Sequence, residues 1–251
     1  MKTSEFLYVA NWKMQIPFAQ AISFCWNHKD GLESLSAKEG VRVVLCPSFD
    51  ALHLIAQVFI DSSLSVGAQN CAQHESGSYT GEVSAQSISD IGCEFCIVGH
   101  SERRNFFSEN DPVIAAKIQQ VLKKGLTPII CVGETKQERE QNQTAVVIKS
   151  QVESACEAIK MAGSDSPVCI AYEPVWAIGS GVVPENQQIE VVLKQVDSIA
   201  KEIIPNNHVF LLYGGSVNDQ NAQLLKEMPI VQGFLIGGAS LDFQKFEKIV
   251  T

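Results

Sequence analysis

The stretch that decides the fold runs Phe95-Cys96-Ile97-Val98-Gly99-His100-Ser101-Glu102-Arg103-Arg104. Four apolar residues are followed by a glycine, a histidine and then a serine that precedes three charged residues. A short apolar run suits a buried strand, and a serine before charged residues is typical of a helix start. This stretch therefore predicts a strand that ends at Val98 and passes into a helix, with His100 at the junction.

Similar apolar runs of four to seven residues recur along the whole chain. Eight of them predict strands: Phe6–Ala10, Val41–Cys46, Leu64–Ala68, Phe95–Val98, Thr127–Val132, Val168–Tyr172, Val209–Tyr213 and Gly233–Ile236. None alternates apolar with polar residues as a one-sided sheet would. Continuous apolar runs indicate parallel strands that are covered on both faces.

Stretches with apolar residues at three-to-four spacing lie between the runs and predict helices. They are Ser23–Glu33, Phe49–Phe59, Pro112–Lys124, Gln137–Ala162, Pro184–Ile203 and Asn218–Lys226. Proline is favoured at a first helical position, which we predict for Pro112 and Pro184. Cations followed by glycine are typical of a helix end, as at Lys123, Lys124 and Gly125.

Eight strands that alternate with helices predict the α/β class and a (β/α)8 barrel with a parallel eight-stranded core. An open, doubly wound sheet is the alternative, although no GxGxxG motif follows the first strand. We see no linker, low-complexity tract or shift of composition. We therefore expect one domain over residues 1–251.

The composition narrows the possible partners. The 251 residues are 45% hydrophobic and 19% charged, and the formal net charge is −9. An acidic chain is a poor candidate for binding nucleic acid or an anionic membrane surface. A phosphate site in it would need a local lysine and backbone N–H groups at helix starts. No apolar signal segment opens the chain, and no run is long enough to span a membrane, so we expect a cytoplasmic protein.

The eight cysteines predict neither a disulfide framework nor a metal centre. Cys93 and Cys96 are spaced as a CxxC pair, but no second pair accompanies them. Cys96 continues into an apolar run and is better interpreted as a strand residue. Reduced thiols fit a cytosolic protein, and we expect no metal ion and no cofactor.

Polar and glycine residues follow five of the predicted strands, where a barrel of this class carries its active site. They are Asn11 and Lys13, His100 and Glu102, Glu173, Gly214-Gly215-Ser216, and Gly237-Gly238. Packing needs alone do not explain polar residues at five strand ends. These residues are the candidates for catalysis and binding.

Glu173 is the candidate general base, although a solvated carboxylate or one half of an ion pair is the alternative. The segment after it favours catalysis. Pro174 stiffens one side, Gly179 and Gly181 loosen the other, and the apolar residues 175–178 lie between them. This pattern predicts a lid with an exposed apolar tip that excludes water and raises the basicity of Glu173.

His100 and Lys13 are the candidates for stabilising charge. A helix start disfavours a protonated imidazole, so we expect His100 to stay neutral and donate a hydrogen bond. The alternatives are a packed or surface histidine and an ordinary surface lysine. Glu102 lies two residues after His100 and could orient Lys13 by an ion pair, or it is a first-turn carboxylate that favours the helix dipole.

The two Gly-Gly segments, Gly214-Gly215 and Gly237-Gly238, follow the seventh and eighth strands. Glycine lets backbone N–H groups approach a phosphate closely, and barrels often bind phosphate after these two strands. One Gly-Gly pair is weak evidence because turns use it often, but two pairs at the expected strands predict a phosphate site.

The chain resembles the triosephosphate isomerase family over its whole length, and five segments carry the resemblance. They are Asn11-Trp12-Lys13, residues 99–104, residues 172–179, Tyr213-Gly214-Gly215-Ser216-Val217, and residues 233–241. The resemblance implies a TIM barrel that interconverts D-glyceraldehyde 3-phosphate and dihydroxyacetone phosphate without cofactor or metal, in glycolysis and gluconeogenesis.

The resemblance also implies roles for single residues. Glu173 would be the base and His100 the electrophile, while Lys13 and Asn11 would bind substrate and stabilise charge. The phosphate would be bound by Gly179, Ser216, Gly237 and Gly238. Tyr213 and Ser216 would latch the closed lid, and Cys131 would support Glu173.

Residues 69–82 resemble the family's dimer loop, which implies a homodimer in which Thr80 reaches toward Asn11 and Lys13 of the other subunit. From composition alone this is a long polar loop, and such loops are uncommon unless functional. Three departures from the family pattern are Val182-Val183 in the lid hinge before Pro184, Gln232 before the last strand, and Cys71-Ala72 in the dimer loop.

Two other functions remain as alternatives. One is another phosphate-binding barrel enzyme, such as an aldolase or a tryptophan-pathway barrel. A Schiff-base aldolase would need a lysine within a strand, and none of the eight runs contains one. A non-catalytic sugar-phosphate-binding barrel would be expected to lose Glu173 or His100 first.

Overall fold

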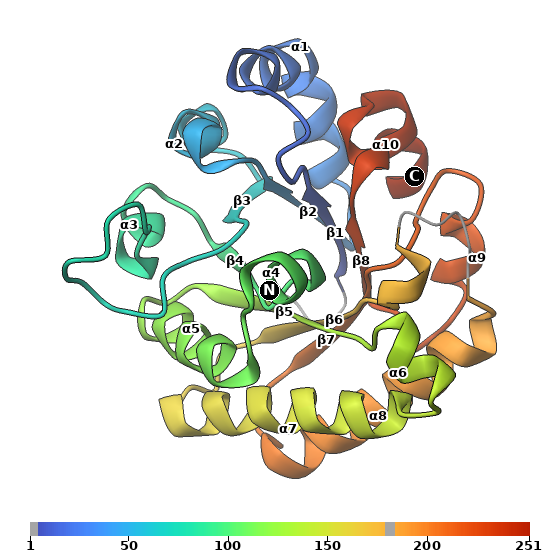
Figure 1. The fold of residues 1–251 in the computed structure, drawn as a ribbon. Helices are drawn as coiled ribbons and strands as arrows, with labels where there is room; N and C mark the ends of the chain where they lie inside the picture. Colours follow the sequence, from blue (N-terminus) through green and yellow to red (C-terminus); the bar gives the residue numbers. More distant parts are fainter. Residues whose placement is uncertain (1–4, 179–183) are drawn as a thin grey trace.

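Eight parallel strands form a closed barrel in the computed structural model, which describes residues 5–178 and 184–251. The strands are β1 (Phe6–Asn11), β2 (Val41–Cys46), β3 (Ser65–Ala68), β4 (Phe95–Val98), β5 (Thr127–Val132), β6 (Val168–Tyr172), β7 (Val209–Tyr213) and β8 (Gly233–Ile236). They follow one another around the ring in sequence order, and β1 pairs with β8 to close it (Figure 1). The fold is therefore the predicted (β/α)8 barrel.

The strand predictions are confirmed almost to the residue. Six strands have the predicted bounds, β1 extends one residue further to Asn11, and β3 begins at Ser65 rather than Leu64. Leu64 is still buried, but its neighbour Ser65 is the first residue of β3 that pairs with β2. The extension of β1 places Asn11 at the end of a strand.

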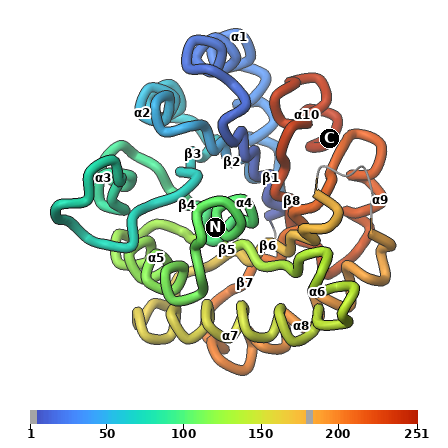
Figure 2. Tube along the Cα trace, viewed as in Figure 1, coloured from blue at the N-terminus to red at the C-terminus, as the bar shows by residue number. Residues whose placement is uncertain are grey.

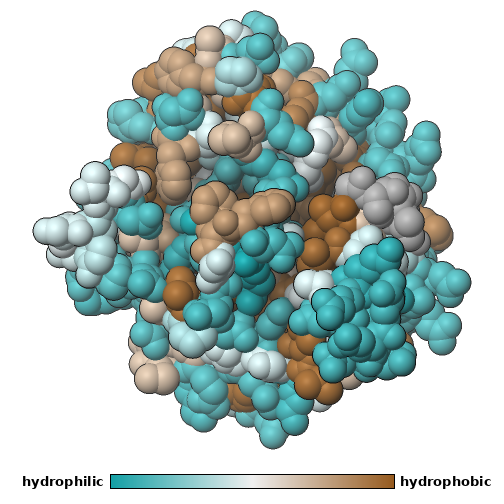
Figure 3. Space-filling model, viewed as in Figure 1, coloured by the Kyte–Doolittle hydropathy of each residue, from teal (hydrophilic) through white to brown (hydrophobic). Residues whose placement is uncertain are grey.

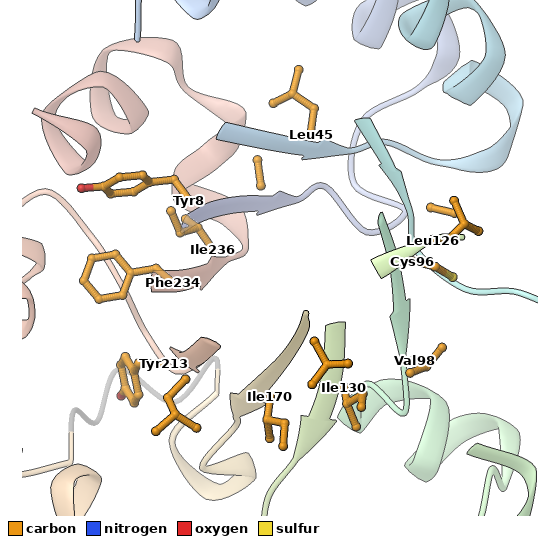
Figure 4. Close-up of a cluster of buried hydrophobic side chains, with 14 of the residues drawn as sticks. Tyr8, Leu45, Cys96, Val98, Leu126, Ile130, Ile170, Tyr213, Phe234 and Ile236 are labelled. Atoms are coloured by element: carbon orange, nitrogen blue, oxygen red, sulfur yellow. The ribbon is translucent and has the colours of Figure 1, made fainter. Parts of the chain in front are cut away.

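Successive residues of each strand point to opposite faces, and both faces are buried. On β1, Leu7 and Val9 belong to a cluster inside the barrel, whereas Tyr8 and Ala10 belong to the larger cluster between the strands and the helices. Figure 4 shows residues of this outer cluster, among them Tyr8, around the ring of strands. Burial of both faces is why the strand sequences do not alternate.

Helices surround the barrel on all sides (Figures 1 and 2). They are α1 (Phe18–Ser36), α2 (Phe49–Val58), α3 (Ala85–Asp90), α4 (Ser101–Phe107), α5 (Asp111–Lys123), α6 (Lys136–Glu140), α7 (Thr144–Ala162), α8 (Asn186–Ile203), α9 (Ala222–Lys226) and α10 (Phe243–Val250). Two 3-10 turns, η1 (Val175–Ala177) and η2 (Gly238–Leu241), follow β6 and β8. The predicted end of α5 is confirmed, with Lys123 in its last turn and Gly125 at φ +73°.

The prediction of one helix over Gln137–Ala162 is wrong, because the chain forms α6 and α7 there. A capping box between Thr135 and Glu138 starts α6, and Asn142 then adopts a left-handed φ of +56°. That backbone conformation cannot continue a right-handed helix. The apolar spacing of α7 concealed the break.

Two further differences concern two short helices and the start of α8. The short helices α3 and α10 were not among the predicted helices, and six or eight residues give too little periodicity to identify them. Pro184 is not the first residue of α8. Glu185 is the N-cap and forms a capping box with Gln188, which fixes the start of the helix at Asn186.

Within the described residues, no helix is long and apolar enough to cross a membrane, and no group of three or more His, Cys, Asp or Glu side chains could hold a metal ion. All eight cysteines are free and buried, and Cys96 is a strand residue as interpreted. The face seen in Figure 3 is mostly hydrophilic, with scattered hydrophobic patches.

Candidate active site

Seven of the predicted site residues line one cavity of about 450 Å³ at the ends of the strands. Its lining includes Asn11, Lys13, His100, Glu173, Ser216, Gly237 and Gly238, together with Ile178, Gly214 and Gly215. These residues follow β1, β4, β6, β7 and β8. Five strand ends therefore contribute to a single cavity, as the strand-end argument requires.

Glu173 and His100 are in direct contact. His100 Nε2 lies 3.0 Å from Glu173 Oε1, and the backbone N–H of Ser101 donates to Glu173 Oε2 at 3.0 Å. The Glu173 side chain is 2% exposed and the His100 side chain 7%. Both oxygens of the carboxylate are thus engaged by the start of α4, in a setting that excludes most water.

The backbone of Glu173 is fixed by its neighbours on both sides. Its N–H donates to Val132 O at 2.7 Å, which continues the pairing of β5 with β6. A Cβ on Gly133 would lie 1.7 Å from Glu173 O, and one on Gly214 would lie 2.9 Å from Glu173 Cγ. Both glycines are therefore required by the close approach of Glu173.

His100 is itself the N-cap of α4, one residue before the predicted helix start. Its Nδ1 accepts the backbone N–H of Glu102 at 3.2 Å. A nitrogen that accepts a hydrogen bond carries no proton, so this contact assigns the proton of a neutral ring to Nε2. Nε2 faces Glu173 and the cavity.

Burial and contact act in opposite directions on the pKa of each partner. Burial lowers the pKa of His100, but the adjacent Glu173 carboxylate outweighs this and leaves the His100 pKa above its ordinary value. Burial raises the pKa of Glu173, but His100 and the Ser101 N–H leave it below its ordinary value. The expectation that water exclusion raises the basicity of Glu173 therefore does not hold while Glu173 contacts His100.

Lys13 is held at the mouth by three contacts. Its N–H donates to Asn11 Oδ1 at 3.1 Å, its Nζ donates to Glu102 Oε1 at 2.7 Å, and its carbonyl accepts from Gln69 Nε2 at 2.9 Å. Asn11 is buried, and Lys13 is partly buried. Glu102 thus pairs with Lys13, and its Oε2 also lies 3.7 Å from His100 Nδ1.

Gly237 and Gly238, which also line the cavity, have open space around them. A Cβ on Gly237 or Gly238 would meet nothing closer than 3.7 Å, namely Lys13 Cε beside Gly237. Without a Cβ at these two positions, a ligand can approach their backbone closely. Ser216 lies beside them, whereas Gly179, also predicted to bind phosphate, lies outside the described residues.

Three further predicted residues occupy different environments. Cys131 is fully buried inside the barrel, where burial and the nearby Glu173 carboxylate raise its pKa. Tyr213 OH is buried without a hydrogen-bond partner among the described residues, and a Cβ on Gly215 would lie 2.2 Å from it. Thr80 is exposed on the loop that projects from the barrel between β3 and α3 (Figure 1).

The segment after Glu173 does not form an exposed apolar tip over its described part. Residues Val175–Ala177 form the turn η1, Ala177 is fully buried, and Val175 and Trp176 are half-buried. Ser216 Oγ donates to Ala177 O at 3.1 Å. Packing against the barrel replaces the predicted exposure, because the turn directs Trp176 toward a buried partner.

That partner is Glu134, which our sequence analysis missed. It is fully buried after β5 and accepts from Trp176 Nε1 at 2.9 Å, from Tyr172 OH at 3.2 Å and from Arg139 Nη1 at 3.2 Å. The Arg139 guanidinium also lies 4.0 Å from the centroid of the Trp176 ring. The signal that points to it is its position, since Glu134 follows a strand end as Glu173 does.

Four further polar residues that were not predicted line the same cavity: Gln15, Asn218, Asp219 and Lys245. Lys245 belongs to the first turn of α10, and Asp242 caps this helix by accepting its N–H. A lysine shortly after a glycine segment at a strand end is the signal that would have identified it.

Comparison with known proteins agrees with this geometry. A family model described as triosephosphate isomerase matches residues 6–251. A triosephosphate isomerase of Thermodesulfovibrio yellowstonii is 40% identical over 244 residues, which cover 96% of this chain and 97% of that protein. The chain is also similar to the triosephosphate isomerase of Nitrosococcus oceani, at 41% identity over 96% of this chain and 95% of that protein. Its identity to the triosephosphate isomerase of Aquifex aeolicus is 37%, over 97% of this chain and 98% of that protein.

Proposed function

Because the chain belongs to the triosephosphate isomerase family, we propose that it interconverts D-glyceraldehyde 3-phosphate and dihydroxyacetone phosphate. The observation that supports this most is the convergence of Glu173, His100 and Lys13 on one cavity that Gly237 and Gly238 also line. A Glu–His pair and open glycine backbone in the same cavity fit a short phosphorylated aldehyde or ketone. The residues at the site supply the chemistry without a cofactor or metal.

The reaction moves one carbon-bound proton between C1 and C2, and one hydroxyl proton between the oxygens on these two carbons, through an enediolate. Glu173 takes the proton from one carbon and returns it to the other. The Nε2–H of His100 donates to the carbonyl oxygen as negative charge develops on it, and the ammonium of Lys13 stabilises the same charge. For this step Glu173 turns from His100 Nε2 toward the substrate carbon, which both side chains can reach because both line the cavity.

Movement of Glu173 away from His100 also changes the protonation of the His100 ring. Burial lowers the pKa of His100, and the Glu173 carboxylate is the larger of the two carboxylates that raise it, the other being Glu102. When Glu173 moves to the substrate, burial and the Glu102 N–H at Nδ1 both favour the neutral ring. A neutral imidazole then donates a hydrogen bond from Nε2 without placing a full positive charge in the site.

The phosphate of the substrate would lie against Gly237 and Gly238. We assign its binding to Ser216, Gly237 and Gly238, and also to Gly179. Backbone N–H groups supply positive potential without adding a charged side chain. This matters in a chain of net charge −9, whose overall field repels an anionic substrate.

Two hydroxyls would control the lid after Glu173. Ser216 Oγ already binds Ala177 O, at the start of the lid. Tyr213 OH is buried and has no hydrogen-bond partner in the described part of the chain, so it is free to accept one when the lid closes. Cys131 is buried inside the barrel next to the Glu173 side chain, and it would limit the room behind the base.

We propose a homodimer formed through the loop that carries Thr80. A second cavity, of about 240 Å³, opens beside the active site and is lined by Asn11, Lys13, Gln69 and Glu102 among others. The exposed Thr80 of a second copy would enter this cavity and contact Asn11 and Lys13. We further propose that residues 1–251 form one domain and that the enzyme acts in the cytoplasm, in glycolysis and gluconeogenesis.

The two alternative functions have less support. The strands contain no lysine for a Schiff base, which argues against an aldolase of that type. A non-catalytic binding barrel would not need the buried contact between Glu173 and His100. That contact requires two titratable groups to be removed from water, which is unfavourable unless they have a use.

A coupled assay with glyceraldehyde 3-phosphate tests the proposal. Wild-type protein should turn the substrate over, and Glu173→Ala should reduce kcat by about 10²- to 10⁴-fold. Glu140→Ala, which removes an exposed carboxylate, is the matched control and should leave kcat unchanged. Glycerol 3-phosphate should still bind to Glu173→Ala. Binding of this ligand by a wild-type protein that does not turn over substrate would instead indicate the non-catalytic barrel.

A further inference from the structure

Lys13 has an unusual backbone for a lysine. Its φ is +52°, in the left-handed region, where residues other than glycine are disfavoured. The conformation persists only if surrounding contacts enforce it. Since the Lys13 side chain leaves from this Cα, the backbone conformation decides where Nζ lies in the site.

Gln69 supplies one of the enforcing contacts. It follows the last residue of β3, and its side-chain Nε2 donates to two backbone carbonyls, Lys13 O and Cys46 O, each at 2.9 Å. Cys46 is the last residue of β2, and Lys13 lies two residues beyond β1. One amide therefore ties the ends of three neighbouring strands together at the edge of the cavity.

The contacts to Lys13 divide between its side chain and its backbone. Glu102 holds Nζ, and Asn11 accepts from the Lys13 N–H. In the part of the chain that the structure describes, Gln69 is the group that donates to the Lys13 carbonyl. Without it, the peptide after Lys13 can rotate, and the residue can relax toward a negative φ with its ammonium displaced.

We propose that Gln69 is a positioning residue for the isomerase reaction, and that it acts by holding Lys13 in its left-handed conformation. This role rests on the proposed function, because it concerns charge stabilisation by Lys13. It differs from the dimer loop assignment, since both acceptors of the Gln69 amide belong to its own chain. Gln69 touches Lys13 and not the reacting atoms.

The test compares Gln69→Met with a matched control. Methionine has the length of glutamine but donates no hydrogen bond. Asn207→Leu is the control, because the Asn207 amide also donates to two backbone carbonyls, Ser164 O and Ser166 O, away from the cavity. Both variants lose two side-chain hydrogen bonds to backbone, and only one of them loses a contact to Lys13.

We expect Gln69→Met to lower kcat/KM by about 10- to 100-fold, the size of effect that follows from a misplacement of about 1 Å. The dissociation constant for glycerol 3-phosphate should rise, while Asn207→Leu should leave both quantities within twofold of wild type. If Gln69→Met does not fold, Gln69→Asn serves instead, because its shorter amide cannot reach both carbonyls. A wild-type value of kcat/KM in a folded Gln69 variant would overturn the proposal.

A Lys13→Met background separates positioning from a general structural role. If Gln69 acts through Lys13, adding Gln69→Met to Lys13→Met should change neither kcat/KM nor glycerol 3-phosphate affinity further. A second loss of similar size would show that Gln69 acts independently of Lys13 and would contradict the proposal. An inactive wild-type protein would instead contradict the proposed function, so the two failures are distinguishable.

Discussion

His100 Nε2 lies 3.0 Å from Glu173 Oε1, so the two side chains that should exchange protons with a substrate are bound to each other. The Ser101 N–H holds the second carboxylate oxygen. This arrangement stabilises the ionised base and protects it from water, but it also lowers its pKa. In the proposed mechanism, the substrate must therefore draw Glu173 away from the start of α4.

The first prediction concerns the pKa of His100. In Glu173→Gln the carboxylate that raises this pKa is gone, while burial, which lowers it, remains. The His100 pKa should therefore fall relative to wild type, as measured by titration of the imidazole NMR signals. An unchanged or higher value in the variant would show that Glu173 does not control the ring.

The contact between Glu173 and His100 should also make the stability of the folded protein depend on pH. The lowered pKa of Glu173 contributes stability above its ordinary value of 4.5, and this is lost as pH falls through the folded value. The raised pKa of His100 contributes stability below its ordinary value of 6.5, and this is lost as pH rises through the folded value. The stability difference between wild type and Glu173→Gln should thus be largest between these two values in urea unfolding. A difference that is constant with pH would contradict the pairing.

The second prediction contrasts Gly133→Ala with Gly214→Ala. A Cβ on Gly133 would meet the Glu173 carbonyl oxygen at 1.7 Å, so backbone must move and the protein should lose about 1–3 kcal/mol of stability or more. A Cβ on Gly214 meets the Glu173 side chain at 2.9 Å, so Glu173 should be displaced and kcat reduced by about tenfold or more.

Urea unfolding and steady-state kinetics separate these two outcomes. Gly133→Ala should lose more stability than Gly214→Ala, and Gly214→Ala should lose kcat while remaining folded. Equal stability losses with normal kcat in Gly214→Ala would show that Glu173 has room to adjust.

The third prediction concerns Glu134, which is buried with Trp176, Tyr172 and Arg139 around its carboxylate. Glu134→Gln keeps the shape but places two donors where four donors already meet, the fourth being Thr144 Oγ1. It should reduce the free energy of unfolding by about 1–3 kcal/mol, and it should change the fluorescence contributed by Trp176. Glu153→Gln removes an exposed carboxylate from an ion pair and should change stability by less than about 1 kcal/mol. Equal effects of both substitutions would contradict a structural role for Glu134.

The fold could be predicted from sequence because its signal is local. Each strand is a short apolar run with both faces buried, and this pattern is visible without knowing the neighbours of the strand. The break between α6 and α7 could not be predicted, because it depends on the left-handed backbone of Asn142 and not on apolar spacing. The start of α8 depended in the same way on a cap at Glu185.

The site was predicted as far as strand ends determine it. Their positions at strand ends identify Asn11, His100 and Glu173 as site residues, but these positions do not say which atoms touch. The pKa direction of Glu173 depends on a residue 73 positions away in the chain, and Trp176 binds a carboxylate at Glu134. Such pairs are set by the closure of the barrel and are invisible in any single segment.

The last prediction concerns the local field at the cavity. Lys245 lines the cavity beside Gly238, and within the described ranges its ammonium belongs to no ion pair, unlike Lys13, which Glu102 neutralises. Lys245→Glu should therefore lower kcat/KM several-fold at low ionic strength, because the reversed charge repels the incoming phosphate. The difference from wild type should shrink as salt is added, since exposed charges are screened over about 10 Å at 0.1 M. Lys194→Glu, on α8, is the matched control, because it changes the net charge equally, from −9 to −11, at an exposed position that does not line the cavity. If both reversals lowered kcat/KM to the same extent, the effect would come from the total charge of the protein and not from the position of Lys245.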